Sequence, residues 1–171
     1  MKKILLLLAF SAGALSTFAQ TASKTDGGKF SIGIDAGLPT GNANNYSDFA
    51  IGGDLKYALA VAGNWDLSLS AGYTSFLGKT ITVDGISTNA GDVKGIPVKF
   101  AGRYNFDGNA GFFAEAAVGA AFIQDGGGTT FLYAPGIGYA LKNGFEIGAR
   151  YEGWSNNGTV SQVALRAAYS F

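Results

Sequence analysis

From Lys29 to the end of the chain, apolar and polar side chains alternate, which is the period of a half-buried β-strand. Bulky apolar and aromatic residues keep to one face of each alternating segment. Eight such segments run from Phe30 to Leu38, Phe49 to Leu59, Trp65 to Tyr73, Ile96 to Phe106, Phe112 to Phe122, Phe131 to Tyr139, Phe145 to Tyr151 and Val163 to Phe171. The pattern predicts an all-β fold with eight strands.

The connections between these segments alternate in length. Three are short and rich in turn formers, around Gly63-Asn64, Asp107-Gly108-Asn109 and Asn143-Gly144. Four are longer, from Thr40 to Asp48, Ser75 to Asp92, Gln124 to Gly128 and Ser155 to Ser161. The second long connection contains Thr80 to Val83 followed by Asp84-Gly85, which predicts a small hairpin. This layout is typical of an antiparallel up-and-down barrel with both termini on the short-turn side.

The face opposite the bulky apolar residues carries small side chains, such as Gly37, Ser70 and Ala117, which fit the narrow interior of an eight-stranded barrel. The charged residues of the strands fall on this same face. They are Asp35, Asp54, Lys56, Asp66, Lys99, Arg103, Glu115, Glu146, Arg150, Glu152 and Arg166. Uncompensated burial of a charge is costly, so six acids facing five bases predict an ion-pair network in the lumen.

Aromatic residues lie at the two ends of the apolar face. At the short-turn ends stand Phe30, Tyr57, Trp65, Tyr104, Phe112, Tyr139, Phe145 and Phe171; at the other ends stand Phe49, Tyr73, Phe122, Tyr133 and Tyr151. Two such girdles are expected where rings meet lipid headgroups. They favour a transmembrane barrel over a soluble, lipocalin-like barrel, whose apolar face would be inside.

The short turns suggest specific lumen contacts. Placing Tyr104 opposite Ala114 puts Arg103 opposite Glu115, and placing Tyr57 opposite Trp65 puts Lys56 opposite Asp66. Directly opposed side chains are close enough to pair, so both couples are predicted to form ion pairs.

The N-terminus has the organisation of a signal peptide. Lys2 and Lys3 precede an apolar core that starts at Ile4, and the small residues Thr17 and Ala19 stand before Gln20. We therefore expect a signal peptide over residues 1–19, a flexible lead-in over residues 20–28 and a barrel domain over residues 29–171.

The composition of the chain excludes several kinds of functional site. The chain has no Cys and no His, and its formal net charge is zero. It therefore lacks disulfides, thiolate metal sites, the commonest general base and the basic surface of a nucleic-acid-binding protein. We expect no cofactor and no metal site, and no nucleic acid as partner.

At the last strand, Val163, Leu165, Ala167, Tyr169 and the terminal Phe171 resemble the C-terminal strand that outer-membrane proteins present to the barrel-assembly machinery. The resemblance implies an assembly signal at Tyr169 and Phe171. The end of the signal peptide, Phe18-Ala19-Gln20, is similar to those of the Bacteroidetes.

The mature chain resembles the small outer membrane protein beta-barrel domain, or porin-like, family of OmpA/OmpX-like eight-stranded barrels. Because the sequence stops at Phe171, we expect it to lack the C-terminal peptidoglycan-binding domain of full-length OmpA-type proteins. The resemblance implies an outer-membrane location, with membrane lipid and lipopolysaccharide as partners beside the assembly machinery and an unidentified surface partner.

Some small outer-membrane barrels are enzymes, namely lipid A acyltransferases, lipid A deacylases and omptin proteases. Each resembled family uses a His, which this chain lacks, so we expect no enzymatic activity. Glu146 and Glu152 are interpreted as ion-pair partners of Arg150, and Trp154 as a plug at the outer mouth. The leading hypothesis is a structural or surface-interaction protein. The alternatives are a narrow pore for small solutes and a soluble secreted binding barrel.

Overall fold

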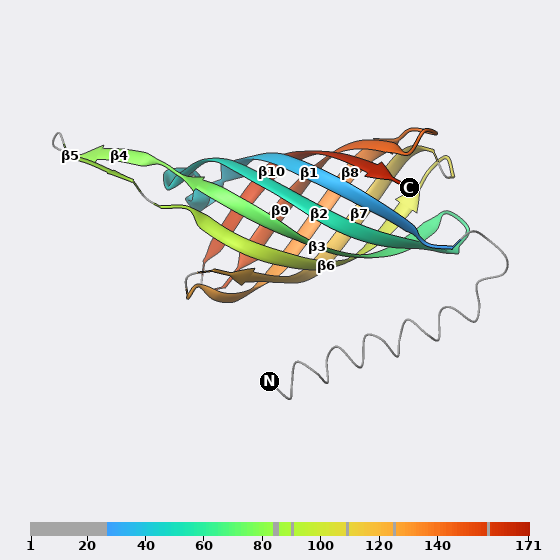
Figure 1. Cartoon of the computed structure of the whole chain (residues 1–171), viewed down its shortest axis with the longest axis horizontal. Helices are drawn as coiled ribbons and strands as arrows, with labels where there is room; N and C mark the ends of the chain where they lie inside the picture. Colours follow the sequence, from blue (N-terminus) through green and yellow to red (C-terminus); the bar gives the residue numbers. More distant parts are fainter. Residues whose placement is uncertain (1–26, 84–85, 90, 109, 125, 157) are drawn as a thin grey trace, which may run out of the picture.

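The computed structural model describes residues 27–83, 86–89, 91–108, 110–124, 126–156 and 158–171. The predicted signal peptide and residues 20–26 of the predicted lead-in lie outside the described residues. Eight antiparallel strands close into one barrel (Figure 1). Around the barrel these are β1 (Lys29–Thr40), β2 (Ser47–Ala62), β3 (Trp65–Gly78), β6 (Val93–Asn105), β7 (Gly111–Ile123), β8 (Gly128–Ala140), β9 (Phe145–Ser155) and β10 (Thr159–Ser170). The predicted eight-stranded architecture is confirmed.

The connections divide the barrel into a short-turn end and a long-loop end. Both β1 and β10 have their outer termini at the short-turn end, as predicted. At the long-loop end, the 3-10 helix η1 (Gly41–Asn45) joins β1 to β2. No helix in the described ranges is long and apolar enough to span a membrane.

The predicted hairpin between β3 and β6 is present as a separate two-stranded sheet of β4 (Thr80–Val83) and β5 (Ile86–Asn89). It projects beyond the long-loop end (Figure 1). Its expected turn, Asp84-Gly85, lies outside the described residues.

The two faces of the barrel wall have opposite character. Ile34, Ile137 and Leu165 point outward and are 67%, 68% and 67% exposed, whereas the inward Ala164 is fully buried. Aromatic contacts tie neighbouring strands together at the short-turn end, as in Phe30–Tyr57, with ring centroids 4.7 Å apart. The outer surface is therefore an apolar belt edged by aromatic rings, and the polar side chains of the wall point into the lumen.

The register between β2 and β3 differs from the prediction. Tyr57 lies opposite Leu69 and Lys56 opposite Ser70, whereas Trp65 lies opposite Ala62. β2 continues through Ala62 to a tight turn at Gly63, whose φ of 55° favours glycine. The prediction ended the strand at Leu59, so it set the pairing several residues away from its actual position.

The C-terminal strand closes the barrel against the first. β1 and β10 pair from Ser31 with Ser170 to Thr40 with Ser161. The backbone N–H of Phe171 donates to the carbonyl oxygen of Phe30 at 2.9 Å. Tyr169 faces outward and its ring contacts Phe145, while the Phe171 side chain is 71% exposed.

Candidate functional site

The lumen is the candidate site because the inward face of every strand contributes to it. All eleven charged residues predicted to face the interior do so. Ten of them form ion pairs, and these fall into two groups along the barrel axis.

The central network comprises three acids and three bases, Asp35, Asp54, Glu152, Lys99, Arg150 and Arg166. Its strongest contact is a two-bond fork from Arg166 to Asp54, with N–O distances of 2.8 and 2.9 Å. Arg150 bonds Asp35 at 2.8 Å, and Lys99 bonds Glu152 at 3.1 Å. The equal number of opposite charges compensates their burial in a wall that excludes water.

The second group, the lower network, consists of Lys56, Arg103, Glu115 and Glu146. Arg103 bonds Glu146 at 2.6 Å, and Lys56 lies 3.3 Å from Glu115 and 3.7 Å from Glu146. Arg103 does lie opposite Glu115 in the register, as predicted. The predicted Arg103–Glu115 ion pair is nevertheless wrong, because Arg103 reaches across the lumen to β9 and Glu115 pairs with Lys56.

Asp66 is placed differently from the other ten residues. The predicted Lys56–Asp66 pair is wrong, because the register puts Asp66 opposite Ala60 and several positions from Lys56. Among the described side chains, the contact to the Asp66 carboxylate comes from an amide: Asn105 Nδ2 donates to Oδ2 at 2.7 Å. Asp66 is thus an acid of the lumen wall with no described cation within ion-pair distance.

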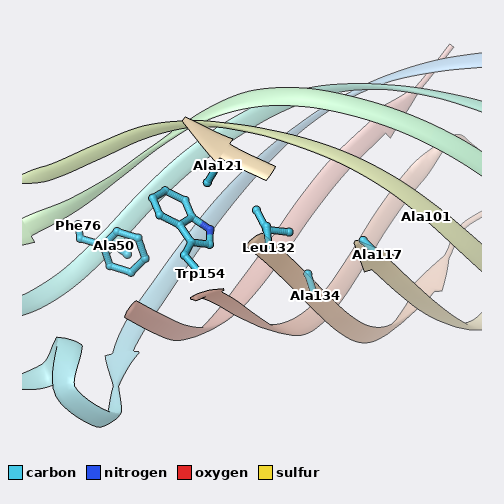
Figure 2. Close-up of a cluster of buried hydrophobic side chains, with 8 residues drawn as sticks. All are labelled: Ala50, Phe76, Ala101, Ala117, Ala121, Leu132, Ala134 and Trp154. Atoms are coloured by element: carbon cyan, nitrogen blue, oxygen red, sulfur yellow. The ribbon is translucent and has the colours of Figure 1, made fainter. Parts of the chain in front are cut away.

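Apolar side chains fill the lumen near the long-loop end. Trp154, Phe76 and Leu132 are 2%, 0% and 0% exposed and lie together inside the barrel with five alanines (Figure 2). The Phe76 ring meets Trp154 edge-on with centroids 5.2 Å apart. We call these three residues the plug.

The plug is joined to the central network. The indole N–H of Trp154 donates to Glu152 Oε1 at 3.0 Å. Across the lumen, a Cβ on Gly95 would lie 2.9 Å from the Trp154 ring, so glycine leaves the space that the indole occupies. Trp154 therefore takes the plugging position predicted for it.

The short-turn end, in contrast, opens into a hollow of about 760 Å³, which we call the vestibule. Lys56, Arg103, Glu115 and Glu146 form its floor, and Asp66 lines its wall. Between the two networks lies a cavity of about 20 Å³, enough for roughly one water molecule. The lumen is thus open at one end and filled at the other.

The described side chains do not form a metal site. No group of three or more Asp, Glu, His or Cys side chains in the described ranges has the arrangement of a metal site. The interpretation of both carboxylates as partners of Arg150 holds for Glu152, which pairs with Arg150 and Lys99. It is wrong for Glu146, which pairs with Arg103 and Lys56 instead.

Comparison with solved structures identifies the architecture. A de novo designed transmembrane β-barrel superposes with a TM-score of 0.60 at 16% identity, covering 87% of this chain and all of the designed chain. The Yersinia pestis outer membrane protein Ail, in a phospholipid bilayer nanodisc, gives a TM-score of 0.58 at 21% identity over 85% of this chain and all of Ail. The chain has the fold of the small outer-membrane β-barrels.

A third structure, the N-terminal β-barrel domain of Pseudomonas aeruginosa OprF, gives a TM-score of 0.51 at 17% identity and covers 85% of this chain and all of that domain. No family model and no curated protein matches the sequence. The likeness to these outer-membrane barrels is therefore one of fold.

The sequence interpretation missed several lumen residues. Phe113 supports Arg103, whose guanidinium carbon lies 3.7 Å from the ring centroid. Phe76 and Leu132 belong to the plug. All three are in phase with inward-facing neighbours such as Ser70, Glu115 and Ala134. The alternation pattern therefore places these three residues on the inward face. They were not assigned to it because they are apolar and the rest of that face is small or polar.

Proposed function

We propose that this chain is a non-enzymatic integral protein of the outer membrane with a structural or surface-interaction role, carried by its long-loop end. The observation behind the proposal is the combination of an outward apolar belt with a lumen filled at the long-loop end. The belt supports residence in lipid, because exposed apolar surface of this extent is unfavourable in water. The plug leaves the loops, rather than a channel, as the part available to partners.

The filled lumen argues against the alternative of a narrow pore. A solute moving along the axis would meet Trp154, Phe76 and Leu132 and then the paired charges of the central network. Small eight-stranded barrels have interiors that side chains just fill, and this barrel follows that rule over the central and long-loop parts of its length. We expect no stable conductance from the wild-type protein.

The exposed apolar belt likewise argues against a soluble secreted binding barrel. A lipocalin-like barrel keeps its bulky apolar residues inside, around a ligand. Here the centre of the interior holds ion pairs, and apart from the plug and Phe113 the large apolar residues are mostly on the outer face.

A polyanionic surface partner is not part of the proposal. Ail has been solved with the heparin analogue sucrose octasulfate. Among the described residues of this chain, the long-loop end carries the cations Lys79 and Lys94 and the acids Asp48 and Asp92. Lys79 lies 3.0 Å from Asp48 and Lys94 lies 3.4 Å from Asp92, so both cations are already paired. The charge balance does not favour sulfated ligands.

Export by the N-terminal signal peptide, and assembly through Tyr169 and Phe171, belong to the same proposal. The exposed Phe171 side chain beside the closing strand pair is compatible with an assembly signal. Deleting Phe171 should lower the yield of folded barrel in the outer membrane, and substituting the neighbouring Ser170 with Ala is the matched control.

Membrane fractionation combined with heat-modifiable electrophoresis tests the proposal. We expect the protein in the outer-membrane fraction, running faster before boiling than after it. Recovery as a soluble periplasmic protein without detergent would contradict the proposal, and a stable conductance in planar bilayers would favour the pore.

A further inference from the structure

The cavity of about 20 Å³ between the two networks is lined by more cations than acids. Its charged lining residues are Lys56, Lys99, Arg150, Arg166, Asp54 and Glu115. Ser68 and Ser70 add two hydroxyl groups, and the rest of the lining is Ala and Gly. Cations therefore outnumber acids by two around this cavity, although the two networks taken together are balanced.

Three hydrogen-bond donors of the cavity lining have no described acceptor. Arg150 uses its terminal Nη2 to contact Asp35 at 2.8 Å and Glu152 at 3.2 Å, but its buried Nε has no hydrogen-bond partner among the described residues. The hydroxyl groups of Ser68 and Ser70, both buried residues, have no described hydrogen-bond partner either. Buried donors are unfavourable unless an acceptor satisfies them.

The two lysines of the lining supply further donors. Lys56 Nζ donates to Glu115 at 3.3 Å, and Lys99 Nζ donates to Glu152 at 3.1 Å. Each ammonium group carries three N–H donors, and these described hydrogen bonds use one donor of each group. Both lysines are buried, so bulk water does not satisfy the others. The lining therefore presents more donors than its described acceptors take up.

The size of the cavity and its excess of donors select the class of ligand. A volume of about 20 Å³ holds one water-sized species and excludes polyatomic anions such as phosphate. A water molecule accepts only two hydrogen bonds and has two hydrogens of its own to place. A monatomic anion accepts from every donor around it and also offsets the local excess of cations.

We propose that the cavity binds one monatomic anion, such as chloride, which accepts hydrogen bonds from Ser68, Ser70 and the Nε–H of Arg150. Lys56, Ser68 and Glu115 line both this cavity and the vestibule, so the ion enters from the vestibule. The ion links the lower network to the central network. This inference concerns the lumen and is independent of what the long loops bind.

Crystallography of the wild-type, full-length protein in sodium bromide tests the site directly. Bromide scatters anomalously at its absorption edge, and water does not. We expect one anomalous peak between the two networks, within hydrogen-bond distance of the Ser70 hydroxyl. A cavity that holds only a water molecule, or bromide peaks confined to the vestibule and the outer surface, would overturn the proposal.

Urea unfolding in lipid tests the site in solution, with sodium chloride compared with sodium gluconate at equal ionic strength. Gluconate is far larger than the cavity, so the wild-type midpoint should be higher in chloride and should saturate with its concentration. Ser70→Ala should shrink this difference severalfold. Ser31→Ala is the matched control, at a buried serine that lines the vestibule but not the cavity, and should keep the full difference.

Ser70→Asp supplies a tethered carboxylate in place of the ion. Its unfolding midpoint should be the same in chloride and in gluconate, and heat-modifiable migration checks that each variant has folded. A chloride effect that is absent from the wild-type protein, or that persists unchanged in Ser70→Asp, would overturn the proposal. The bromide peak in the wild-type crystal decides the matter if a variant does not fold.

Discussion

Arg103 and Glu115 lie directly opposite each other on β6 and β7, yet the Arg103 guanidinium bonds Glu146 on β9, at 2.6 Å. Two contacts orient Arg103 away from its neighbour. Its Nε–H donates to Asn105 Oδ1 at 2.7 Å, and its guanidinium stacks on Phe113. In so narrow a barrel, a long side chain reaches the far wall as easily as the adjacent strand.

This geometry predicts energetic coupling between Arg103 and Glu146. Glu146→Gln should lower the free energy of unfolding by about 3–5 kcal/mol, because it leaves the buried Arg103 charge without its partner. Arg103→Gln should cost less, because Lys56 still lies 3.7 Å from Glu146. The double variant should be milder than the sum of the two, by about 0.5–3 kcal/mol. A double-mutant cycle by urea unfolding in lipid measures this coupling. The Arg103 and Glu115 cycle is the control, and a larger coupling there would reverse our assignment.

A charge introduced on the outward face of β3 should destabilise the barrel by a different mechanism from a charge introduced on its inward face. Leu69 is 48% exposed on the belt, and Ser70, the next residue, is 7% exposed in the lumen. Leu69→Arg should destabilise the barrel by roughly 2–4 kcal/mol if it lies near the bilayer midplane. Ser70→Arg should also destabilise the barrel, because the larger side chain crowds the lumen and its charge has no partner there.

Comparing the two substitutions in thick and thin bilayers separates the mechanisms. The penalty for Leu69→Arg should fall in thin bilayers, where the charge lies nearer the headgroups, and that for Ser70→Arg should not. An unchanged unfolding midpoint for Leu69→Arg would argue that this face does not meet lipid.

The sequence predicted the strands and the direction of their faces because alternation reports burial on one side of a sheet. Lys99, Glu152 and Arg166 could be assigned to the lumen for this reason. Their partners could not be predicted, because contacts across a lumen depend on how far each strand is shifted against the next. The end of β2 shows this, since placing it at Leu59 instead of Ala62 moved Lys56 away from its true neighbour Ser70.

The plug was only partly predictable for a related reason. Trp154 was recognised because it stands on the lumen side of a strand near a long loop. Phe76 and Leu132 come from β3 and β8, which do not pair with each other. Only closure of the barrel brings these two strands near Trp154.

The base of the projecting hairpin should respond to acid. The backbone N–H of Gly78 donates to Asp92 Oδ1 at 3.0 Å, and this bond, with Lys94 nearby, holds the pKa of Asp92 below its usual range. The Asp92 carboxylate therefore stabilises the fold at pH values above the pKa that Asp92 has in the unfolded chain. This stabilisation is lost as the pH falls through the lower pKa that Asp92 has in the folded protein.

The Gly78 amide resonance, followed by NMR during acid titration, reports this change. We expect it to move with a midpoint below that of an unperturbed Asp and to be insensitive to pH in Asp92→Asn. A midpoint above the ordinary Asp value would contradict the assigned hydrogen bond.

Sulfated polysaccharides should bind this protein weakly at physiological salt, because both lysines at the long-loop end are paired with aspartates. Asp48→Lys with Asp92→Lys would free Lys79 and Lys94 and reverse the charge balance, so retention on a sulfated resin should rise. Strong retention of the wild-type protein would contradict this expectation. Lys142→Glu, at the short-turn end, is the control and should have no effect.

The central claim is that bulky residues face lipid while the plug is sealed inside, and the two tryptophans of the chain test it directly. Trp65 is 51% exposed on the belt and Trp154 is 2% exposed in the lumen. Trp65→Phe and Trp154→Phe give two single-tryptophan proteins, each reconstituted in vesicles with and without brominated acyl chains. We predict that bromine quenches the emission of Trp65 and leaves that of Trp154 nearly unchanged. Quenching of Trp154, or emission from Trp65 that bromine does not affect, would contradict the orientation of the wall.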